Sequence, residues 1–182
     1  REEVVKVYKT MSKTMLTDLG VLPDKESRDL YHAALSVSSF DPLSADEVVQ
    51  DLCEQYIVKG AYTCDYDCFK ALYQATARSI ERSGIPSHVA ILSLIPRKDG
   101  LGTQELSQAM ETFEKSMRHS LRRGDIVTRC SASQLIALLM NANCENSQLA
   151  CKRVISAFEA QNPDSPYRID YAVRSVSERK HL

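Results

Sequence analysis

The segment LRRGDIVTRCSASQLIALLM, residues 121–140, contains the charged side chains whose spacing suggests ligand chemistry. Arg122 and Asp125 belong to an R-x-x-D pattern, and Arg129 follows in the next apolar run. An arginine can bind a phosphate or the edge of a guanine base through two parallel hydrogen bonds, and an aspartate can accept hydrogen bonds from base N–H groups. A purely structural interpretation stays open, because basic residues, Gly124 and an aspartate are also typical of a helix end and its following turn.

The second polar feature of this segment is the short connection between two apolar runs, IVTRC and LIALLM. Such a pattern predicts a β-hairpin, with Ser131, Ala132, Ser133 and Gln134 at or beside its tip. These side chains offer hydroxyl, methyl and amide groups, whereas Mg²⁺ and similar hard cations need carboxylate oxygens. The tip therefore carries neither the paired carboxylates nor the glycine-rich contacts that hairpin tips often supply to ligands.

The six cysteines do not form a recognisable metal or disulfide pattern. Cys64 and Cys68 are the closest pair, and the others are scattered along the chain: Cys53, Cys130, Cys144 and Cys151. Zinc modules usually supply four ligands in compact pairs, so reduced thiols in a cytoplasmic protein and no resident cofactor are expected. The four histidines are isolated as well, and each is expected to be an ordinary surface or hydrogen-bonded residue.

Composition limits the classes of partner. Charged residues make up 26% of the 182 residues, and the formal net charge is −1, so these residues do not favour direct binding to DNA. The longest apolar run, residues 89–95, is much shorter than the ~20 residues of a membrane helix, and we expect a folded, soluble chain. Because the sequence begins at Arg1 without a methionine or a signal segment, we expect a fragment of a longer protein.

The periodicity of apolar residues predicts the elements that position these side chains. The predicted helices span residues 4–19, 24–35, 44–56, 67–83, 103–121 and 146–158, with caps at Asp24, Thr103 and Asn146. The predicted strands are 88–95, 126–130, 135–140 and 167–173. From Ser87 onward this order is β-α-β-β-α-β, which predicts an α+β, ferredoxin-like fold with one antiparallel sheet of about four strands, helices on one face and an N-terminal helical extension.

Several short matches within this pattern resemble the GGDEF domains of bacterial diguanylate cyclases. They are ARSIERSGIP, AILSL, LRRGD and the hairpin IVTRC-SASQL-IALLM, and the resemblance extends from about Cys64 to Val176. It implies a GGDEF or nucleotide-cyclase-like sheet, in a family that joins two GTP molecules into cyclic di-GMP. In that family, glycines at the hairpin tip let the backbone approach the nucleotide, and acidic residues hold the catalytic metal ions.

The same alignment implies that the catalytic residues are replaced in this chain. Ser131 and Ala132 stand in place of the two glycines, Ser133 and Gln134 replace the acidic pair, and Leu135 keeps an apolar side chain. The family also has a metal-binding aspartate after the first strand, where this chain reads SLIP at residues 93–96. Because hard divalent cations need carboxylate oxygens, we expect a degenerate, non-catalytic domain without a metal site; an active diguanylate cyclase is the less favoured alternative.

One family feature is retained at the R-x-x-D motif. Arg122 and Asp125 match the inhibitory product site of diguanylate cyclases, and five residues separate them from the hairpin tip as in the family. This match implies a cyclic di-GMP receptor, or a receptor for another nucleotide, with Arg129 as a possible further contact. An RNA-binding domain with the same order of elements is disfavoured, because the two hairpin strands lack the aromatic residues that stack on bases.

The segment of residues 7–35, VYKTMSKTMLTDLGVLPDKESRDLYHAAL, is similar to the closing helices of the bacterial transcriptional activator domain. That helical-repeat module usually follows a winged-helix DNA-binding domain. The two resemblances together imply residues 1–43 as the end of the repeats plus a linker and residues 44–182 as the degenerate GGDEF-like domain of a cytoplasmic transcription regulator. Self-association or a protein partner is then expected, with DNA bound only by a domain outside this chain. An ordinary amphipathic helical hairpin remains an alternative for the first segment.

Overall fold

The computed structural model describes residues 2–16, 21–35, 44–52, 59–98 and 102–177. Its contacts divide the chain into two compact units, Arg1–Val58 and Lys59–Leu182, which are described separately here. The predicted domain division at residue 43 falls outside the described residues and stays a prediction.

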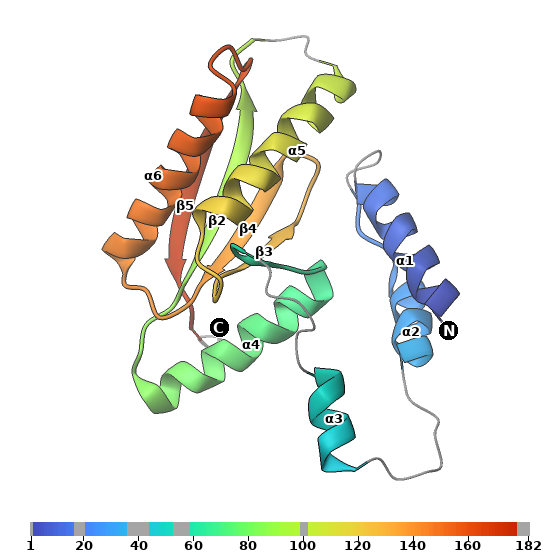
Figure 1. Ribbon diagram of the computed structural model, residues 1–182. Helices are drawn as coiled ribbons and strands as arrows, with labels where there is room; N and C mark the ends of the chain where they lie inside the picture. The colour runs from blue at the N-terminus through green and yellow to red at the C-terminus, as the bar shows by residue number, and fades with distance from the viewer. Residues whose placement is uncertain (1, 17–20, 36–43, 53–58, 99–101, 178–182) are drawn as a thin grey trace, which may run out of the picture. The chain divides into compact units, whose positions relative to one another are not determined.

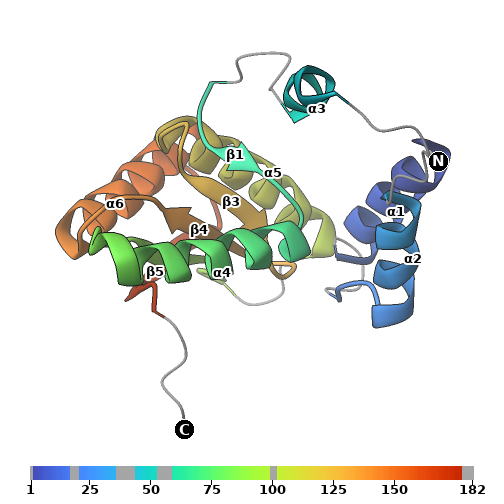
Figure 2. The ribbon, with the colours of Figure 1, turned by 90° about the horizontal axis from the view of Figure 1, so that it is seen from below.

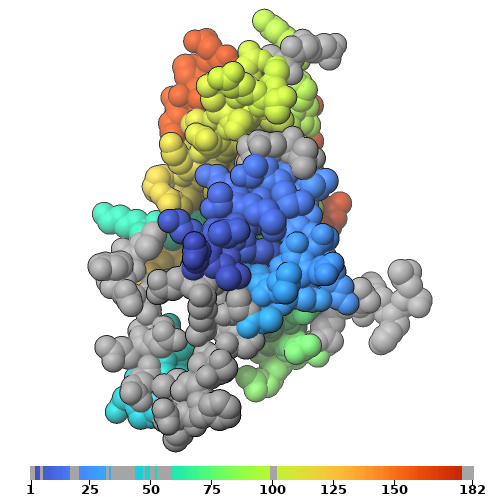
Figure 3. All heavy atoms as spheres, turned by 90° about the vertical axis from the view of Figure 1, so that its right-hand side faces the viewer, coloured from blue at the N-terminus to red at the C-terminus, as the bar shows by residue number. Residues whose placement is uncertain are grey.

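The first unit contains three helices, α1 (Glu2–Thr14), α2 (Lys25–Leu35) and α3 (Ala45–Leu52). The rings of Tyr8 and Tyr31 stack with 4.2 Å between their centroids and hold α1 against α2. The space-filling view of Figure 3 shows the side chains of these two helices, in dark and light blue, packed into one body. The predicted cap of α2 is confirmed, since Asp24 Oδ1 accepts a hydrogen bond of 2.7 Å from the Ser27 N–H.

The second unit is built on one five-stranded sheet (Figure 1). Its strands are β1 (Tyr62–Thr63), β2 (His88–Pro96), β3 (Ile126–Arg129), β4 (Gln134–Leu139) and β5 (Tyr167–Ser175). The spatial order is β1-β3-β4-β2-β5, and all neighbouring pairs are antiparallel except β1 with β3. The four longer strands have the predicted ferredoxin-like order, so the α+β fold class is confirmed. The prediction missed β1, because a strand of two residues shows no alternation of apolar and polar side chains.

Three helices of 18 residues each accompany this sheet: α4 (Tyr66–Ser83), α5 (Thr103–Ser120) and α6 (Cys144–Gln161). The cap of α5 is Gly102, whose N–H donates to Glu105 Oε2, whereas Thr103 was the predicted cap. The start of α6 also differs from the prediction. Asn143 Oδ1 accepts the Asn146 N–H at 2.8 Å, so the helix begins at Cys144 and not at Asn146.

Both faces of the sheet are covered by helices, as Figure 2 shows. On one face, α5 and α6 bury an apolar core in which Phe113 and Phe158 meet edge to face, with 5.8 Å between ring centroids. The predicted helices after Ser87 therefore lie on one face, as expected. The preceding helix, α4, buries Phe69 against Ile126 and Leu138 on the opposite face. Because successive side chains of a strand point to opposite faces, β3 and β4 supply apolar residues to both cores.

Candidate functional site

Asp125 lies between the end of α5 and the start of β3, and the residue is 5% exposed. One oxygen, Oδ2, accepts a hydrogen bond of 2.9 Å from the Arg122 N–H, and the other, Oδ1, accepts one of 3.1 Å from the Met140 N–H. The Asp125 carbonyl also accepts the Tyr62 N–H at 2.9 Å. Asp125 thus joins the α5–β3 turn to the end of β4 and to β1, which is the structural use that the sequence left open.

The protonation of Asp125 reflects this burial. Removal from water raises the pKa of the carboxyl above its ordinary value, while the two N–H donors and the charges of Arg122 and Arg153 act in the opposite direction.

A small pocket of about 180 Å³ opens beside this carboxylate. Its polar lining comes from Arg122, Asp125, Asn146 and Arg153, and the rest is mainly apolar: Leu139, Met140, Ala142, Leu149 and Ala150. Arg153 also donates a hydrogen bond of 2.6 Å from Nε to the Ser120 carbonyl, which ties α6 to the end of α5. A pocket with two arginines and an amide can accept an anionic group such as a phosphate.

Arg153 was missed by the sequence prediction. It stands on the exposed part of α6 and belongs to no local motif with Arg122. Only the docking of α6 beside the α5–β3 turn brings these two arginines to the same pocket.

Arg129 does not line this pocket, although the sequence suggested it as a further ligand contact. It is the last residue of β3, while Asp125 directly precedes the first, so the two residues lie at opposite ends of the strand. Its Nε donates a hydrogen bond of 3.1 Å to the Ser131 carbonyl, and its Nη2 donates one of 2.9 Å to the Ala132 carbonyl. Burial lowers the pKa of Arg129, and the nearby Glu114 and Glu111 partly compensate.

The hairpin tip is held by a further set of neutral hydrogen bonds. Gln134 Nε2 donates 2.9 Å to Ser93 Oγ on β2, and the Gln134 carbonyl accepts the Cys130 N–H at 3.1 Å. The Ser133 N–H donates to Ser131 Oγ at 3.3 Å, and Leu135 is fully buried in the core under the sheet. The polar groups of the tip therefore mostly hydrogen-bond to one another, and the Arg129 guanidinium binds two of the tip carbonyls.

The described residues contain no group of three His, Cys, Asp or Glu side chains arranged to hold a metal ion. Five cysteines in these ranges are free thiols, and burial raises the pKa of Cys151 to about 11. Cys53 lies outside the described residues. In the described ranges, no helix is long and apolar enough to cross a membrane.

Comparison of this chain with known sequences and comparison with solved structures give different results. No family model and no curated protein matches the chain. Among solved structures, a DGC protein from Thermotoga maritima has a TM-score of 0.52 at 16% identity, covering 65% of this chain and 83% of that one. The active GGEEF domain of a diguanylate cyclase from Vibrio cholerae gives 0.57 at 14% identity, over 65% of this chain and 80% of that one.

A third solved structure extends over the whole chain. It is the diguanylate cyclase SiaD in complex with its activator SiaC from Pseudomonas aeruginosa, with a TM-score of 0.56, 15% identity and coverage of 100% of this chain. This chain spans 61% of that protein. At these identities, the likeness shows a shared fold: the chain has the α+β fold of GGDEF domains.

Proposed function

We propose that the second unit is a non-catalytic, GGDEF-like signalling domain of a cytoplasmic bacterial transcription regulator, which acts by self-association or by binding a protein partner. The observation that supports this proposal is the hydrogen-bond network of the hairpin tip. Gln134 is bound to Ser93, and Arg129 is bound to the carbonyls of Ser131 and Ala132. Ser131, Ala132, Ser133 and Gln134 carry no negative charge where the resemblance places glycines and acidic residues.

The chemistry of the tip works against nucleotide cyclisation. A Mg²⁺ or Mn²⁺ ion that polarises a phosphate needs several oxygen ligands, commonly from carboxylates. In this hairpin the serine hydroxyls and the Gln134 amide cannot supply negative charge, and the half-buried Arg129 would repel a cation. The side chains of Ser131 and Ala132 also occupy space that glycines would leave for the nucleotide.

Incubation of the purified chain with GTP and either Mg²⁺ or Mn²⁺ tests the lack of catalysis. The expected result is no cyclic di-GMP by chromatography, with an active diguanylate cyclase as the positive control under the same conditions. The variant Arg129→Ala serves as a second sample, and it should also form no product, because removing the cation restores no carboxylate. Formation of cyclic di-GMP by the unmodified chain would refute the proposal.

A protein partner is the form of signalling that one solved structure supports by analogy, since SiaD is described in complex with its activator SiaC. The similarity of residues 7–35 to a helical-repeat module supports the assignment to a transcription regulator whose DNA-binding part is outside this chain. Sedimentation velocity over a concentration series tests self-association. A chain that stays monomeric at all concentrations would leave a different protein as the required partner.

A second candidate function is a receptor for cyclic di-GMP, and the pocket beside Asp125 favours it. Arg122 and Arg153 both line this pocket, and two guanidinium groups suit a ligand with two phosphates. Calorimetric titration with cyclic di-GMP should then give binding that Arg122→Ala and Arg153→Ala each weaken at least about tenfold, a change of about 1.4 kcal/mol. Arg168→Ala, on β5, is the matched control and should bind like the unmodified chain. Absence of heat at high ligand concentration would remove this candidate.

A further inference from the structure

The strand β5 forms one edge of the sheet, because it pairs with β2 and lies at the end of the strand order. It spans nine residues, Tyr167–Ser175, which is longer than most strands in globular proteins. An edge strand of this length presents a row of backbone N–H and C=O groups to which another strand can pair. What happens to these outward groups decides whether the edge can accept a partner strand.

The register shows which backbone groups of β5 point outward. The Val176 N–H donates a hydrogen bond of 2.9 Å to the Ser87 carbonyl, and the Arg97 N–H donates one of 2.7 Å to the Pro166 carbonyl. Both pairs continue the register of the β2–β5 ladder. In an antiparallel ladder, the residues that exchange hydrogen bonds alternate with residues that do not. The even-numbered residues of β5 therefore direct their backbone groups toward β2, and the odd-numbered residues direct theirs away from the sheet.

Two of these outward groups are bound by charged side chains of β5 itself. Asp170 Oδ1 accepts the Tyr171 N–H at 2.9 Å, and Arg174 Nη1 donates 2.9 Å to the Val173 carbonyl. Both charged side chains belong to exposed residues. They lie on either side of the central part of the strand, where an incoming strand would need the same Tyr171 and Val173 groups.

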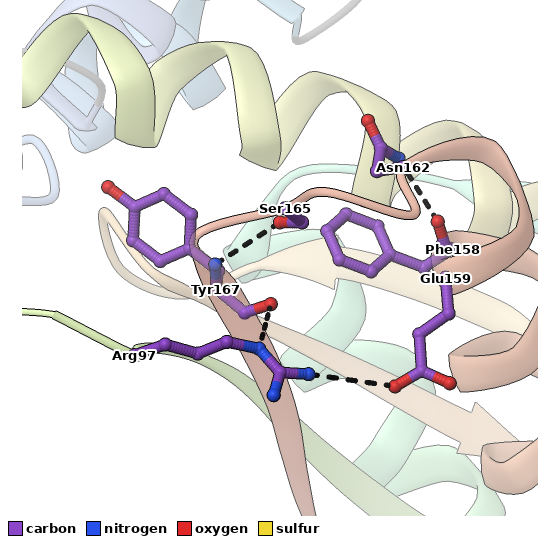
Figure 4. Close-up of polar contacts among 6 residues, drawn as sticks. All are labelled: Arg97, Phe158, Glu159, Asn162, Ser165 and Tyr167. Carbon is purple, nitrogen blue, oxygen red and sulfur yellow. Dashed lines mark hydrogen bonds and ion pairs between the residues drawn. The ribbon is translucent and has the colours of Figure 1, made fainter.

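The first residue of the strand, Tyr167, is bound by side chains from outside β5, as Figure 4 shows. The Tyr167 N–H donates 3.2 Å to Ser165 Oγ, and Arg97 Nε donates 3.3 Å to the Tyr167 carbonyl. The guanidinium of Arg97 also approaches the Glu159 carboxylate, with 4.0 Å between Nη2 and Oε1, so Arg97 lies between the strand and α6. Both outward groups of Tyr167 therefore have partners from within the chain.

We propose that Arg97, Asp170 and Arg174, the edge-capping residues, hinder strand addition at the β5 edge by occupying three of its outward backbone groups: the Tyr167 carbonyl, the Tyr171 N–H and the Val173 carbonyl. An incoming strand must first displace these side chains from the backbone groups that it would pair with. Charged residues at a sheet edge are a known protection against edge-to-edge association. The inference goes beyond the proposed function, because it states which surface self-association or partner binding does not use: the β5 backbone.

The double variant Asp170→Thr with Arg174→Thr tests this proposal. It removes two edge-capping residues, keeps the formal net charge at −1 because one acid and one base are lost, and introduces residues that favour strands. Arg168→Thr is the matched control, since Arg168 is exposed on the same face of β5 and has no hydrogen bond to an outward group in the described part of the chain. Circular dichroism verifies that all variants are folded.

Sedimentation velocity should show that the double variant self-associates with an apparent constant at least about tenfold above that of the unmodified chain, while Arg168→Thr does not. Hydrogen exchange of a peptide covering residues 169–175 should slow when the double variant associates, because its outward amides become paired. Equal sedimentation of the double variant and the unmodified chain would overturn the proposal. So would association without slower exchange in β5, or equal association of the control.

Discussion

The substitution Asp125→Ala gives the sharpest test of whether this residue is structural or serves only a ligand. In the structure, both carboxylate oxygens accept backbone N–H groups, from Arg122 at 2.9 Å and from Met140 at 3.1 Å. As a residue, Asp125 is only 5% exposed, so little of its surface contacts water. Alanine removes both acceptors without moving the backbone donors.

The magnitude follows from these two bonds. A buried donor left without a partner costs about 1–3 kcal/mol, and relief from burying a charge offsets part of that cost. We expect Asp125→Ala to lower the free energy of unfolding by about 2–4 kcal/mol. Asp125→Asn keeps one acceptor oxygen and should cost about half as much. Arg122→Ala should change stability by less than about 0.5 kcal/mol, because the Arg122 group that Asp125 binds is the backbone N–H and its side chain is exposed.

Urea unfolding followed by circular dichroism measures these differences as shifts of the transition midpoint at constant slope. The order of stability loss, with alanine above asparagine and Arg122→Ala near zero, is the result expected from the structure. If Asp125→Ala were as stable as the unmodified chain, the structural role of this carboxylate would be refuted, and ligand binding would remain the reason for the R-x-x-D motif.

Three further predictions follow from other contacts. Burial raises the pKa of Asp125 above 3.8, so the folded state favours the protonated carboxyl. The stability advantage of the unmodified chain over Asp125→Asn should therefore be greatest below pH 3.8 and fall as the pH rises through the folded-state pKa. Unfolding free energies measured across this pH range test this trend, and an advantage that grows with pH would contradict it. Gly60→Ala should lower the free energy of unfolding in urea by roughly 2 kcal/mol or more, because φ is +86° and a Cβ would collide with the Arg118 carbonyl. Gly124→Ala, with open space around its Cβ, should lower it by less than about 0.5 kcal/mol. Equal losses of stability would refute this explanation. Arg129→Ala should speed hydrogen exchange at residues 130–134, because the Ser131 and Ala132 carbonyls lose their donors, and an unchanged rate would show that the tip is held without the guanidinium.

The alternation and spacing of apolar residues were enough to predict the ferredoxin-like part of the fold. The run at residues 88–95 became β2, and the two runs around Ser131 became β3 and β4, because local side-chain periodicity determines which face of an element is buried. The hairpin itself and the α1–α2 pair were predictable for the same reason.

The site depended on contacts between segments that are distant in sequence. The sequence placed Arg129 with Arg122 and Asp125, but a strand of four residues separates Arg129 from Asp125, and its guanidinium binds the hairpin tip. Arg153 joined the pocket without any local signal, since the packing of α6 decides its position. No sequence motif predicted that Asp170 and Arg174 bind outward backbone groups of β5. The register between β5 and β2 decides which backbone groups point outward, and that register is a tertiary feature.

The sequence by itself determined the order of the elements and the chemical character of the hairpin tip, because both depend on residue types at short spacing. Only the tertiary structure decided which charged side chains meet: Asp125 with the Met140 N–H, Arg153 with the pocket, and Arg129 with the tip carbonyls. The physical reason is that a hydrogen bond requires its donor and acceptor within about 3 Å. Spacing along the chain does not provide that proximity until the helices and strands have packed.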